Sequence, residues 1–338
     1  MMISRIFLGL AAAFLLAGPA PAAKDLDKQV LAMIQAARQM DYQGVLVHGM
    51  PVGVESMRFY HAGDSDGAYR ERLVMLTGPA RELVRDGDSV HRYHPEKGRV
   101  VVGPRRTGTG IFRLDAGDLD RVRAHYRIEQ GPAGRIAGRE SRAIEFRAED
   151  GERFTYRIWR DKATDLPLQT EVLDAEGRVQ ETFMFATVEP GVRPQSSDLE
   201  LGAPSGLPVV RRRRLEDNNP PEILSALELP PGFRLQARFQ GPEGERGHQY
   251  FYSDGLATLS VFLDRTEAAA QADGRSQKIL QRGALHASSL ASGGYRITLL
   301  GELPGAALRR VAESLGSSLA EGRGAVAVLA GRDTRGMD

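Results

Sequence analysis

In the segment Tyr69-Arg70-Glu71-Arg72-Leu73-Val74-Met75-Leu76, a tyrosine and three charged residues are followed by four consecutive apolar ones. Three further segments carry similar apolar runs: Val45-Leu46-Val47, Val100-Val101-Val102 and Phe183-Met184-Phe185-Ala186. In a sheet with one face in water, apolar and polar residues alternate, because successive side chains point to opposite faces. These runs therefore predict strands that are apolar on both faces, and the fold must cover both.

The strands around these runs follow one another closely, and short turns containing glycine separate many of them. A helix over 25–40 precedes them, and a short helix near 115–124 interrupts them. Because so few helices are available for crossovers, the pattern predicts an antiparallel sheet. We expect its strands at 42–49, 53–62, 68–77, 80–86, 89–94, 98–103, 125–130, 141–149, 152–160, 167–174 and 179–189.

The apolar stripe of helix 25–40 can cover one face of this sheet, so the other face needs a second apolar surface. Either the sheet curves around its own interior, or that face lines a pocket for an apolar guest. Met57, Met75 and Met184 favour the pocket, because methionine suits an adaptable apolar lining. Alternation along the strands gives the candidate lipid-cavity residues Val45, Val47, Met57, Phe59, Leu73, Met75 and Phe185.

Composition excludes several classes of protein. The 338 residues carry 45 basic and 44 acidic side chains, a formal charge of +1. No whole-protein field therefore attracts nucleic acid, and we expect no nucleic-acid partner. Cysteine is absent, which excludes disulfides, thiolate catalysis and zinc–thiolate sites.

Residues 1–22 have the pattern of a secretory signal peptide. A basic start precedes an apolar run from Ile6 to Ala17, and Ala20-Pro21-Ala22 supplies the small residues that a signal peptidase needs. This apolar run is too short to span a bilayer, which needs about 20 residues. We therefore expect cleavage after Ala22 and, with no cysteine to oxidise, location in a bacterial periplasm.

A segment rich in proline, 196–221, is interpreted as a linker between a first domain at 23–195 and a second at 222–332. Residues 333–338 are expected to form a flexible tail. In the second domain we expect strands near 233–240, 247–253, 256–263, 280–290 and 294–302, and a helix that Pro304 starts and Gly316 ends. The predicted fold class is α+β: a strongly curved antiparallel sheet closed by helices, and a smaller domain with its own antiparallel sheet.

No catalytic or metal-binding motif in the sequence lies in the secondary structure that its chemistry requires. Gly63-Asp64-Ser65-Asp66-Gly67 matches the pattern around a nucleophilic serine, but a strand follows it instead of the required helix. His91 and His94 lie three apart on a strand and point to opposite faces, so they do not converge on a metal. We therefore predict a protein that is not an enzyme, with no catalytic residues, no cofactor and no metal.

Two groups of residues are candidates for partner binding. Arg211, Arg212, Arg213 and Arg214 form the strongest local charge; a solvated linker explains them most simply, and contact with an anionic partner is the alternative. In the second domain, apolar side chains suited to anchoring a peptide are Phe251, Tyr252, Leu256 and Phe262. Ordinary core packing is the commoner explanation for such residues.

Several stretches together resemble one protein family. In the first domain they are Tyr42-Gln43-Gly44, Arg70-Glu71-Arg72-Leu73, Thr77-Gly78-Pro79-Ala80-Arg81-Glu82-Leu83-Val84, Tyr156-Arg157-Ile158-Trp159-Arg160-Asp161 and Leu166-Pro167-Leu168. In the second they are Leu229-Pro230-Pro231-Gly232-Phe233, Tyr252-Ser253-Asp254-Gly255-Leu256, Ser260-Val261-Phe262 and Gly301-Glu302-Leu303-Pro304. In their order and in their distribution along the chain, these stretches resemble the sequence blocks of the MucB/RseB family. Members of this family are periplasmic regulators of the sigma-E (AlgU-type) envelope-stress pathway.

The resemblance implies a first domain similar to the lipoprotein carriers LolA and LolB, with helices closing an apolar cavity. It also implies binding to the periplasmic domain of a single-pass anti-sigma factor, MucA or RseA. This regulator would protect its partner from the site-one protease and release it on sensing lipid or lipopolysaccharide. The loop 103–116 fits no block of the family, and the sequence leaves a homo-oligomer open.

Two other functions stay open at this point. A periplasmic lipid or lipoprotein carrier would need only the first domain, and such carriers lack anything like residues 222–332. A secreted hydrolase would need the motifs that fail above. The second domain therefore favours the regulator. The strands that are apolar on both faces call for an apolar guest, and we expect lipid binding and partner binding to oppose each other.

Overall fold

The computed structural model describes residues 21–64, 68–104, 112, 114–217, 219–241, 247–265, 279–292 and 294–320. The predicted signal peptide lies outside this part of the chain except for its last two residues, as do Ser65 and the 333–338 tail. Helix α1 (Pro21–Gln39) begins four residues before the predicted start at Asp25.

The first domain is built on one sheet of 12 strands, in the order β12-β6-β5-β4-β3-β2-β1-β11-β10-β9-β8-β7. Neighbours from β1 to β6 and from β7 to β11 pair antiparallel in chain order, which confirms the predicted antiparallel sheet, and β1 joins the two series by pairing with β11. The strands are β1 (Tyr42–Met50), β2 (Gly53–Gly63), β3 (Tyr69–Met75), β4 (Glu82–Asp86), β5 (Ser89–His94), β6 (Arg99–Pro104), β7 (Tyr126–Ile136), β8 (Arg139–Ala148), β9 (Thr155–Asp161), β10 (Pro167–Leu173), β11 (Val179–Pro190) and β12 (Val209–Arg211).

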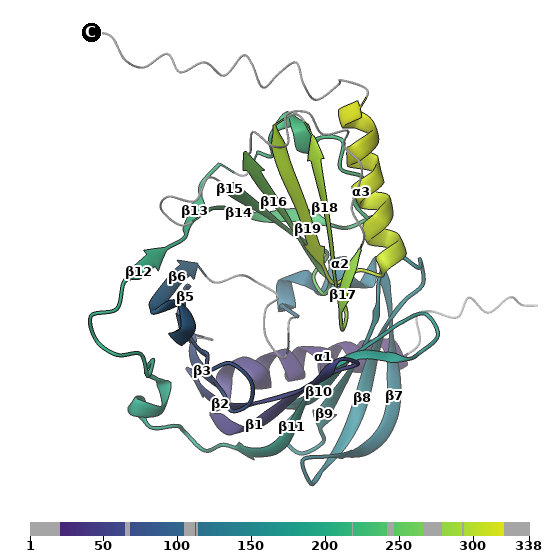
Figure 1. The fold of residues 1–338 in the computed structure, drawn as a ribbon. Coiled ribbons are helices and arrows are strands. Elements are labelled where there is room, and N and C mark those ends of the chain that lie inside the picture. The colour runs from purple at the N-terminus through teal and green to yellow at the C-terminus, as the bar shows by residue number, and fades with distance from the viewer. Residues whose placement is uncertain are drawn as a thin grey trace, which may run out of the picture.

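The sheet curves around α1, which lies on its concave side (Figure 1). Val30, Met33 and Ile34 of α1 are buried in one core with Phe146 and Ile158 of the sheet. The short helices η2 (Ala116–Asp118) and α2 (Leu119–Arg123) border the same core. Burying each large apolar side chain contributes about 1.5–3 kcal/mol, so α1 fixes the β7–β10 half of the sheet.

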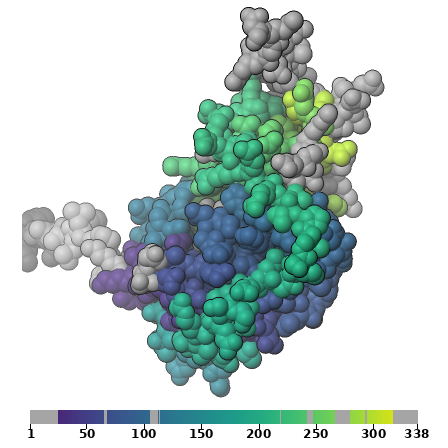
Figure 2. Space-filling view, turned by 90° about the vertical axis from the view of Figure 1, so that its left-hand side faces the viewer, coloured from purple at the N-terminus to yellow at the C-terminus, as the bar shows by residue number. Residues whose placement is uncertain are grey.

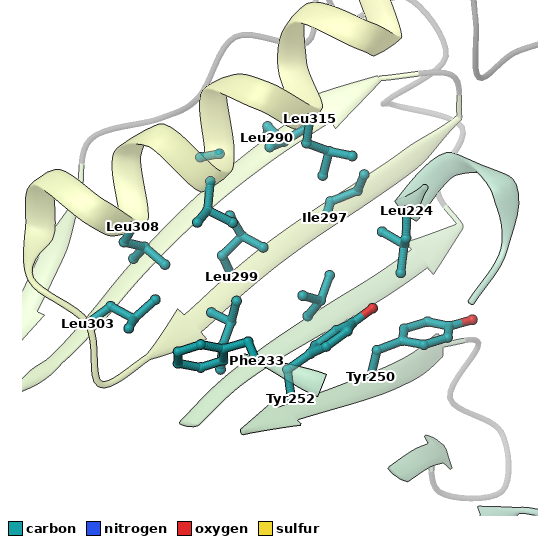
Figure 3. Close-up of a cluster of buried hydrophobic side chains, with 14 of the residues drawn as sticks. Leu224, Phe233, Tyr250, Tyr252, Leu290, Ile297, Leu299, Leu303, Leu308 and Leu315 are labelled. Carbon is teal, nitrogen blue, oxygen red and sulfur yellow. The ribbon is translucent and has the colours of Figure 1, made fainter. Parts of the chain in front are cut away.

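The second domain has a sheet of seven strands and helix α3 (Gly305–Ala320) across one face (Figure 1). Leu308 and Leu315 of α3 pack against Leu290, Ile297 and Leu299 of the sheet, as Figure 3 shows. The predicted α+β class is therefore confirmed, with a separate core in each domain. The strand order is β13 (Arg213–Leu215), β14 (Arg234–Gln240), β15 (Gly247–Ser253), β16 (Thr258–Arg265), β19 (Tyr295–Gly301), β18 (Leu285–Ser292) and β17 (Leu280–Arg282).

Two expectations for the second domain are wrong. The single strand predicted at 280–290 is a hairpin of β17 and β18, which turns at Gly283 with a φ of 61°, a conformation that glycine adopts without strain. Helix α3 does not end at Gly316 but continues to Ala320. Glycine inside a helix costs only about 1 kcal/mol, which the apolar face of α3 outweighs.

Residues 196–221 are more than a linker. Helix η3 (Ser196–Leu199) and the residues after it cross the outer, convex face of the first sheet, seen in green over the blue strands in Figure 2. β12 then pairs parallel to β6, and β13 pairs with β14 of the second sheet. This segment, here called the strap (residues 196–215), contributes an edge strand to each sheet. These two strands could not be predicted from the sequence, because each has only three residues.

Candidate functional site

The concave side of the first sheet carries an apolar cluster, here called the inner cluster. Its rings pack closely: the centroids of Tyr42 and Phe59 are 5.5 Å apart, and those of Phe59 and Phe185 are 5.8 Å apart. Leu73 and Met75 pack against it and are only half-buried. The buried members are Tyr42, Leu46, Met57, Phe59, Leu166, Leu168 and Phe185.

Five of the predicted lipid-cavity residues meet at the inner cluster: Met57, Phe59, Leu73, Met75 and Phe185. Val45 and Val47 do not, because they lie on the opposite face of the sheet from these five. Leu46 pairs directly with Met57 between β1 and β2, so it points inward and its two neighbours point to the outer face. When all residues of a strand are apolar, the sequence does not show which of them point inward. The alternation of apolar and polar residues therefore could not assign the faces of this strand.

The strap covers part of the outer face. Leu199 is 5% exposed. The backbone oxygen of Asp198 accepts a 3.4 Å hydrogen bond from Arg72, and the N–H of Gly202 donates to Glu82 at 2.8 Å. β12 runs along the edge strand β6, on which the outward-pointing Val102 is buried. The second apolar face of these strands is therefore partly covered by the chain itself and does not by itself require a guest.

A buried ionic network adjoins the inner cluster. The Nδ1 of the fully buried His61 lies 3.3 Å from a Glu71 carboxylate oxygen, its Nε2 lies 3.1 Å from the backbone oxygen of Arg38, and Arg85 also contacts the Glu71 carboxylate. Burial opposes ionisation of Glu71, but Arg85 and the bond from His61 outweigh it and lower the pKa of Glu71 to about 2. Burial, reinforced by the Glu71 charge, raises the pKa of Tyr42 well above its usual value. This network ties β2, β3 and β4 together.

The inner face beyond the cluster is more open. Leu73 of β3 is directly opposite Leu83 of β4, and both are half-buried. Val101 of β6 shares their face and is also half-buried. Together with Met75 these residues form what we call the open strip (Leu73, Met75, Leu83 and Val101).

A buried ion pair joins the two domains. The Nε of Arg153 donates to Asp254 Oδ2 at 2.7 Å, and both side chains are fully buried. Tyr126 donates to the same carboxylate at 3.0 Å, and Arg153 also donates to the backbone oxygen of Pro231. Burial and the Asp254 charge raise the pKa of Tyr126 well above its usual value. These contacts fix the second domain against β7–β9.

The turn between β17 and β18 enters the first domain. Ala284 is fully buried in the core that surrounds α1, and its N–H donates to Glu181 at 3.3 Å. The other Glu181 oxygen lies 2.6 Å from His48 Nε2. Beside this turn, Arg282 pairs with Glu55 of β2 at 2.7 Å. The second domain therefore contacts the concave side of the first sheet.

The aromatic and aliphatic residues predicted as partner anchors lie mostly in cores. Phe251 packs with Ala237 and Phe239, and Tyr252 belongs to the main core of the second domain. Leu256 is buried between the domains, and Phe262 is half-buried. As anchors, the first three are therefore misplaced: apolar character alone does not separate an exposed anchor from a core position.

The four arginines lie where the chain passes from one sheet to the other. Arg211 ends β12, and Arg213 and Arg214 begin β13; all three are exposed. Arg212 lies between the strands, half-buried, and its backbone N–H donates to Val102 at 2.8 Å. The segment predicted as solvated therefore has a structural role, while three of its side chains stay accessible.

Histidines and acidic side chains can be placed in the part of the chain that the structure describes. Its residues contain no group of three or more histidine, cysteine, aspartate or glutamate side chains that could hold a metal ion. His91 contacts the hydroxyl of Ser89 at 3.2 Å. Among the described residues, no helix has the length and apolar character needed to cross a membrane.

The chain thus consists of two joined β-rich domains, the first with a partly open apolar strip on its curved sheet. The MucB/RseB N-terminal domain model matches residues 26–202, and the MucB/RseB C-terminal domain model matches residues 220–316. The chain therefore belongs to the MucB/RseB family.

Relatives of known name agree with this assignment. The chain is 28% identical over 305 residues to the sigma factor AlgU regulatory protein MucB of Pseudomonas aeruginosa, covering 89% of this chain and 94% of the relative. It is 25% identical over 284 residues to the sigma-E factor regulatory protein RseB of Escherichia coli K12, covering 83% and 87%. A crystal structure of MucB in complex with MucA(peri) superposes with a TM-score of 0.62 at 25% identity, covering 85% of this chain and 97% of that one.

Proposed function

We propose that the chain is a periplasmic negative regulator of an envelope-stress sigma factor, and that it binds the periplasmic domain of a membrane-anchored anti-sigma factor. One observation carries this proposal. Both domains match the family in order and over most of the chain, and a similar protein has been solved in complex with MucA(peri). Binding would protect the anti-sigma factor by covering its cleavage segment.

The domain contacts support a partner that touches both domains at once. The Arg153–Asp254 pair and the strap hold the domains together. Two domains held in one arrangement form a preorganised surface, and preorganisation lowers the entropy lost on binding. A partner bound across both domains would in turn favour that arrangement.

Lipid would release the partner through linkage. The turn at Ala284 fills part of the concave side, and its hydrogen bond to Glu181 connects it to the first sheet. Each buried CH₂ of an acyl chain contributes about 0.8 kcal/mol, so a long chain can compete with such contacts. If lipid favours a domain arrangement that binds the partner less well, partner and lipid lower each other's affinity by the same factor.

The experiment uses the purified mature chain and the periplasmic segment of the anti-sigma factor from the same organism. Calorimetry should show a one-to-one complex or a defined multiple of it, and digestion of the segment by the site-one protease should slow when the chain is present. Lipopolysaccharide fragments should then weaken the complex. No detectable binding of the segment would contradict the proposal, and unchanged affinity at saturating lipid would contradict lipid release alone.

A lipid or lipoprotein carrier is the second candidate, and the half-buried open strip favours it. A carrier moves its ligand between membranes without the anti-sigma segment. The full chain would then transfer a fluorescent lipid from donor to acceptor vesicles at the same rate with and without the segment. That result would support the carrier over the regulator.

A further inference from the structure

A pocket of about 380 Å³ lies in the second domain, on the face of its sheet that packs under α3. Tyr250 and Leu263 line the pocket and also belong to the core beneath α3, and Tyr295 lines it and packs against that core. In Figure 3, Tyr250 lies at one end of this core, beyond Tyr252. The pocket therefore opens where the apolar core of the second domain ends.

Strand pairing brings polar side chains to the same pocket. Arg238 of β14 is directly opposite Tyr250 of β15, and Arg265 of β16 is directly opposite Tyr295 of β19. Residues in such pairs share a face of the sheet. His248 lies two residues before Tyr250 on β15, so it shares this face as well. The pocket therefore combines two guanidinium groups and an imidazole with two tyrosine rings.

Each arginine of the pocket lies over a tyrosine ring. The guanidinium carbon of Arg238 is 5.5 Å from the centroid of the Tyr250 ring, and that of Arg265 is 5.7 Å from the centroid of the Tyr295 ring. A cation over an aromatic ring at such a distance is attracted to the ring. The rings hold the two guanidinium groups in place, but they do not neutralise their charge.

The described residues at the pocket leave one positive charge in excess. Asp217 Oδ2 lies 3.4 Å from Arg238, and this carboxylate is 61% exposed. No carboxylate among the described residues forms an ion pair with Arg265. Burial and the Arg238 charge lower the pKa of His248 below its usual 6.5, so its imidazole is neutral near pH 7. A ligand with a single negative charge would balance the pocket.

Two polar atoms of these side chains also lack partners. The Nε of Arg238 and the Nδ1 of His248 are buried and have no hydrogen-bond partner. Buried polar atoms without a partner are rare in folded proteins, and a carboxylate oxygen is a strong acceptor for a guanidinium or imidazole N–H. These two atoms are a second indication, besides the charge, that a ligand completes the pocket.

We propose that this pocket of the second domain binds a small aromatic carboxylate. Its carboxylate lies on Arg238 and His248, and its ring lies against the apolar wall of Leu263 and Tyr295, with Arg265 at the exposed rim. The volume suits such a molecule, because pockets for small ligands enclose about 300–1,000 Å³ and combine apolar walls with a few polar groups. This inference goes beyond the proposed function and does not depend on it.

The test compares four probes that separate the ring from the charge. Phenylpropionate carries the ring and one negative charge, phenylpropanol carries the ring alone, acetate carries the carboxylate alone, and phenyl phosphate carries a second negative charge. Binding to the full mature chain is followed by NMR titration, which detects weak ligands. Phenylpropionate should bind most tightly of the four, and the signals that it shifts should be those of β14–β16 and β19.

Variants of Arg238 test the charge. Arg238→Gln should weaken phenylpropionate about tenfold, the effect of losing one charge-assisted hydrogen bond, and should leave phenylpropanol unchanged. Arg238→Lys keeps the charge without the planar guanidinium and should recover part of the lost affinity. Arg296→Gln is the matched control and should bind all four probes like the wild type. Arg296 is exposed and follows Tyr295, so it lies on the opposite face of β19.

A second variant separates loss of the site from loss of the fold. Arg265 is exposed, so Arg265→Gln should keep the melting temperature of the wild type and still weaken phenylpropionate severalfold. The melting temperature of each variant is measured beside its affinity, because Arg238 is half-buried and its replacement also removes the contact with Asp217.

Three results would overturn the inference. The wild type could bind none of the aromatic probes, or Arg238→Gln and Arg265→Gln could bind phenylpropionate as tightly as the wild type does. Tighter binding of phenyl phosphate than of phenylpropionate would show that the pocket takes a dianion, and the assignment to a carboxylate would be wrong. None of these results bears on the proposed function, which is tested separately by binding of the anti-sigma segment.

Discussion

The two halves of the concave face differ in how they are covered. Under α1, the inner side chains of β7–β10 such as Phe146 and Ile158 are almost completely buried. Toward β6, Leu83 and Val101 are half-buried and lie next to Arg92. One sheet thus carries a closed half that stabilises the fold and an open half whose side chains are only half-buried. The predictions below test whether this division holds.

The largest effect is expected in the closed half. Phe146→Ala removes a fully buried ring, and such truncations cost about 3–5 kcal/mol. Urea unfolding followed by circular dichroism measures the change in the free energy of unfolding. A loss below 1 kcal/mol would show that this half is not the stabilising core.

The buried network between the halves should make stability depend on pH. Glu71→Gln leaves Arg85 without its buried partner, a loss of about 3–5 kcal/mol near pH 7. Because the pKa of Glu71 is lowered to about 2 in the folded chain, its contribution is full above its ordinary value of 4.5 and declines as the pH falls toward 2.

Urea unfolding of wild type and Glu71→Gln at several pH values between 7 and 2.5 checks this. The difference between their free energies of unfolding should shrink as the pH is lowered. A difference that stays constant over this range would contradict the ionised state assigned to Glu71.

A smaller effect is expected in the open half. Leu83→Ala should cost only about 1 kcal/mol in stability, because the side chain is half-buried already. The same substitution should weaken binding of the neutral lipid monooleoylglycerol severalfold, because the proposed lipid would lie against these methyl groups. If Leu83→Ala were as destabilising as Phe146→Ala, the two halves would be equally packed and the division would fail.

The smallest effect concerns the exposed pair between β17 and β2. Arg282→Gln breaks the contact with Glu55, in which the arginine side chain is 58% exposed. Pairs of this kind contribute about 0–1 kcal/mol. Thermal unfolding should therefore be almost unchanged, and a large drop in melting temperature would mean that this contact, rather than Ala284, holds the turn in place.

The sequence predicted the first sheet well, because hairpin turns with glycine and short period-two runs are local signals. The prediction from sequence failed where the structure depends on contacts between residues far apart in the chain. The run Val45-Leu46-Val47 is apolar throughout, and its direction is decided by the pairing of Leu46 with Met57 across the sheet. β12 and β13 are too short to recognise, and they exist because each finds an open sheet edge.

The same limit applies to the site. Five of the seven predicted cavity residues gather at the inner cluster, but Tyr42, Phe59 and Phe185 pack against one another there. The more open surface lies further along the sheet, at Leu83 and Val101, which alternation had not singled out. The pair of Arg153 with Asp254 joins residues 101 positions apart, and no short-range pattern signals it.

The most direct test of the account is to find where an acyl chain lies in the full protein. A lysophosphatidic acid with a photoreactive group near the end of its chain is crosslinked to the wild type, and the labelled peptides are identified by mass spectrometry. The account predicts labels on β3, β4 and β6, along the open strip. Labels confined to the outer face around Val45 and Val47, or to the second domain, would contradict it.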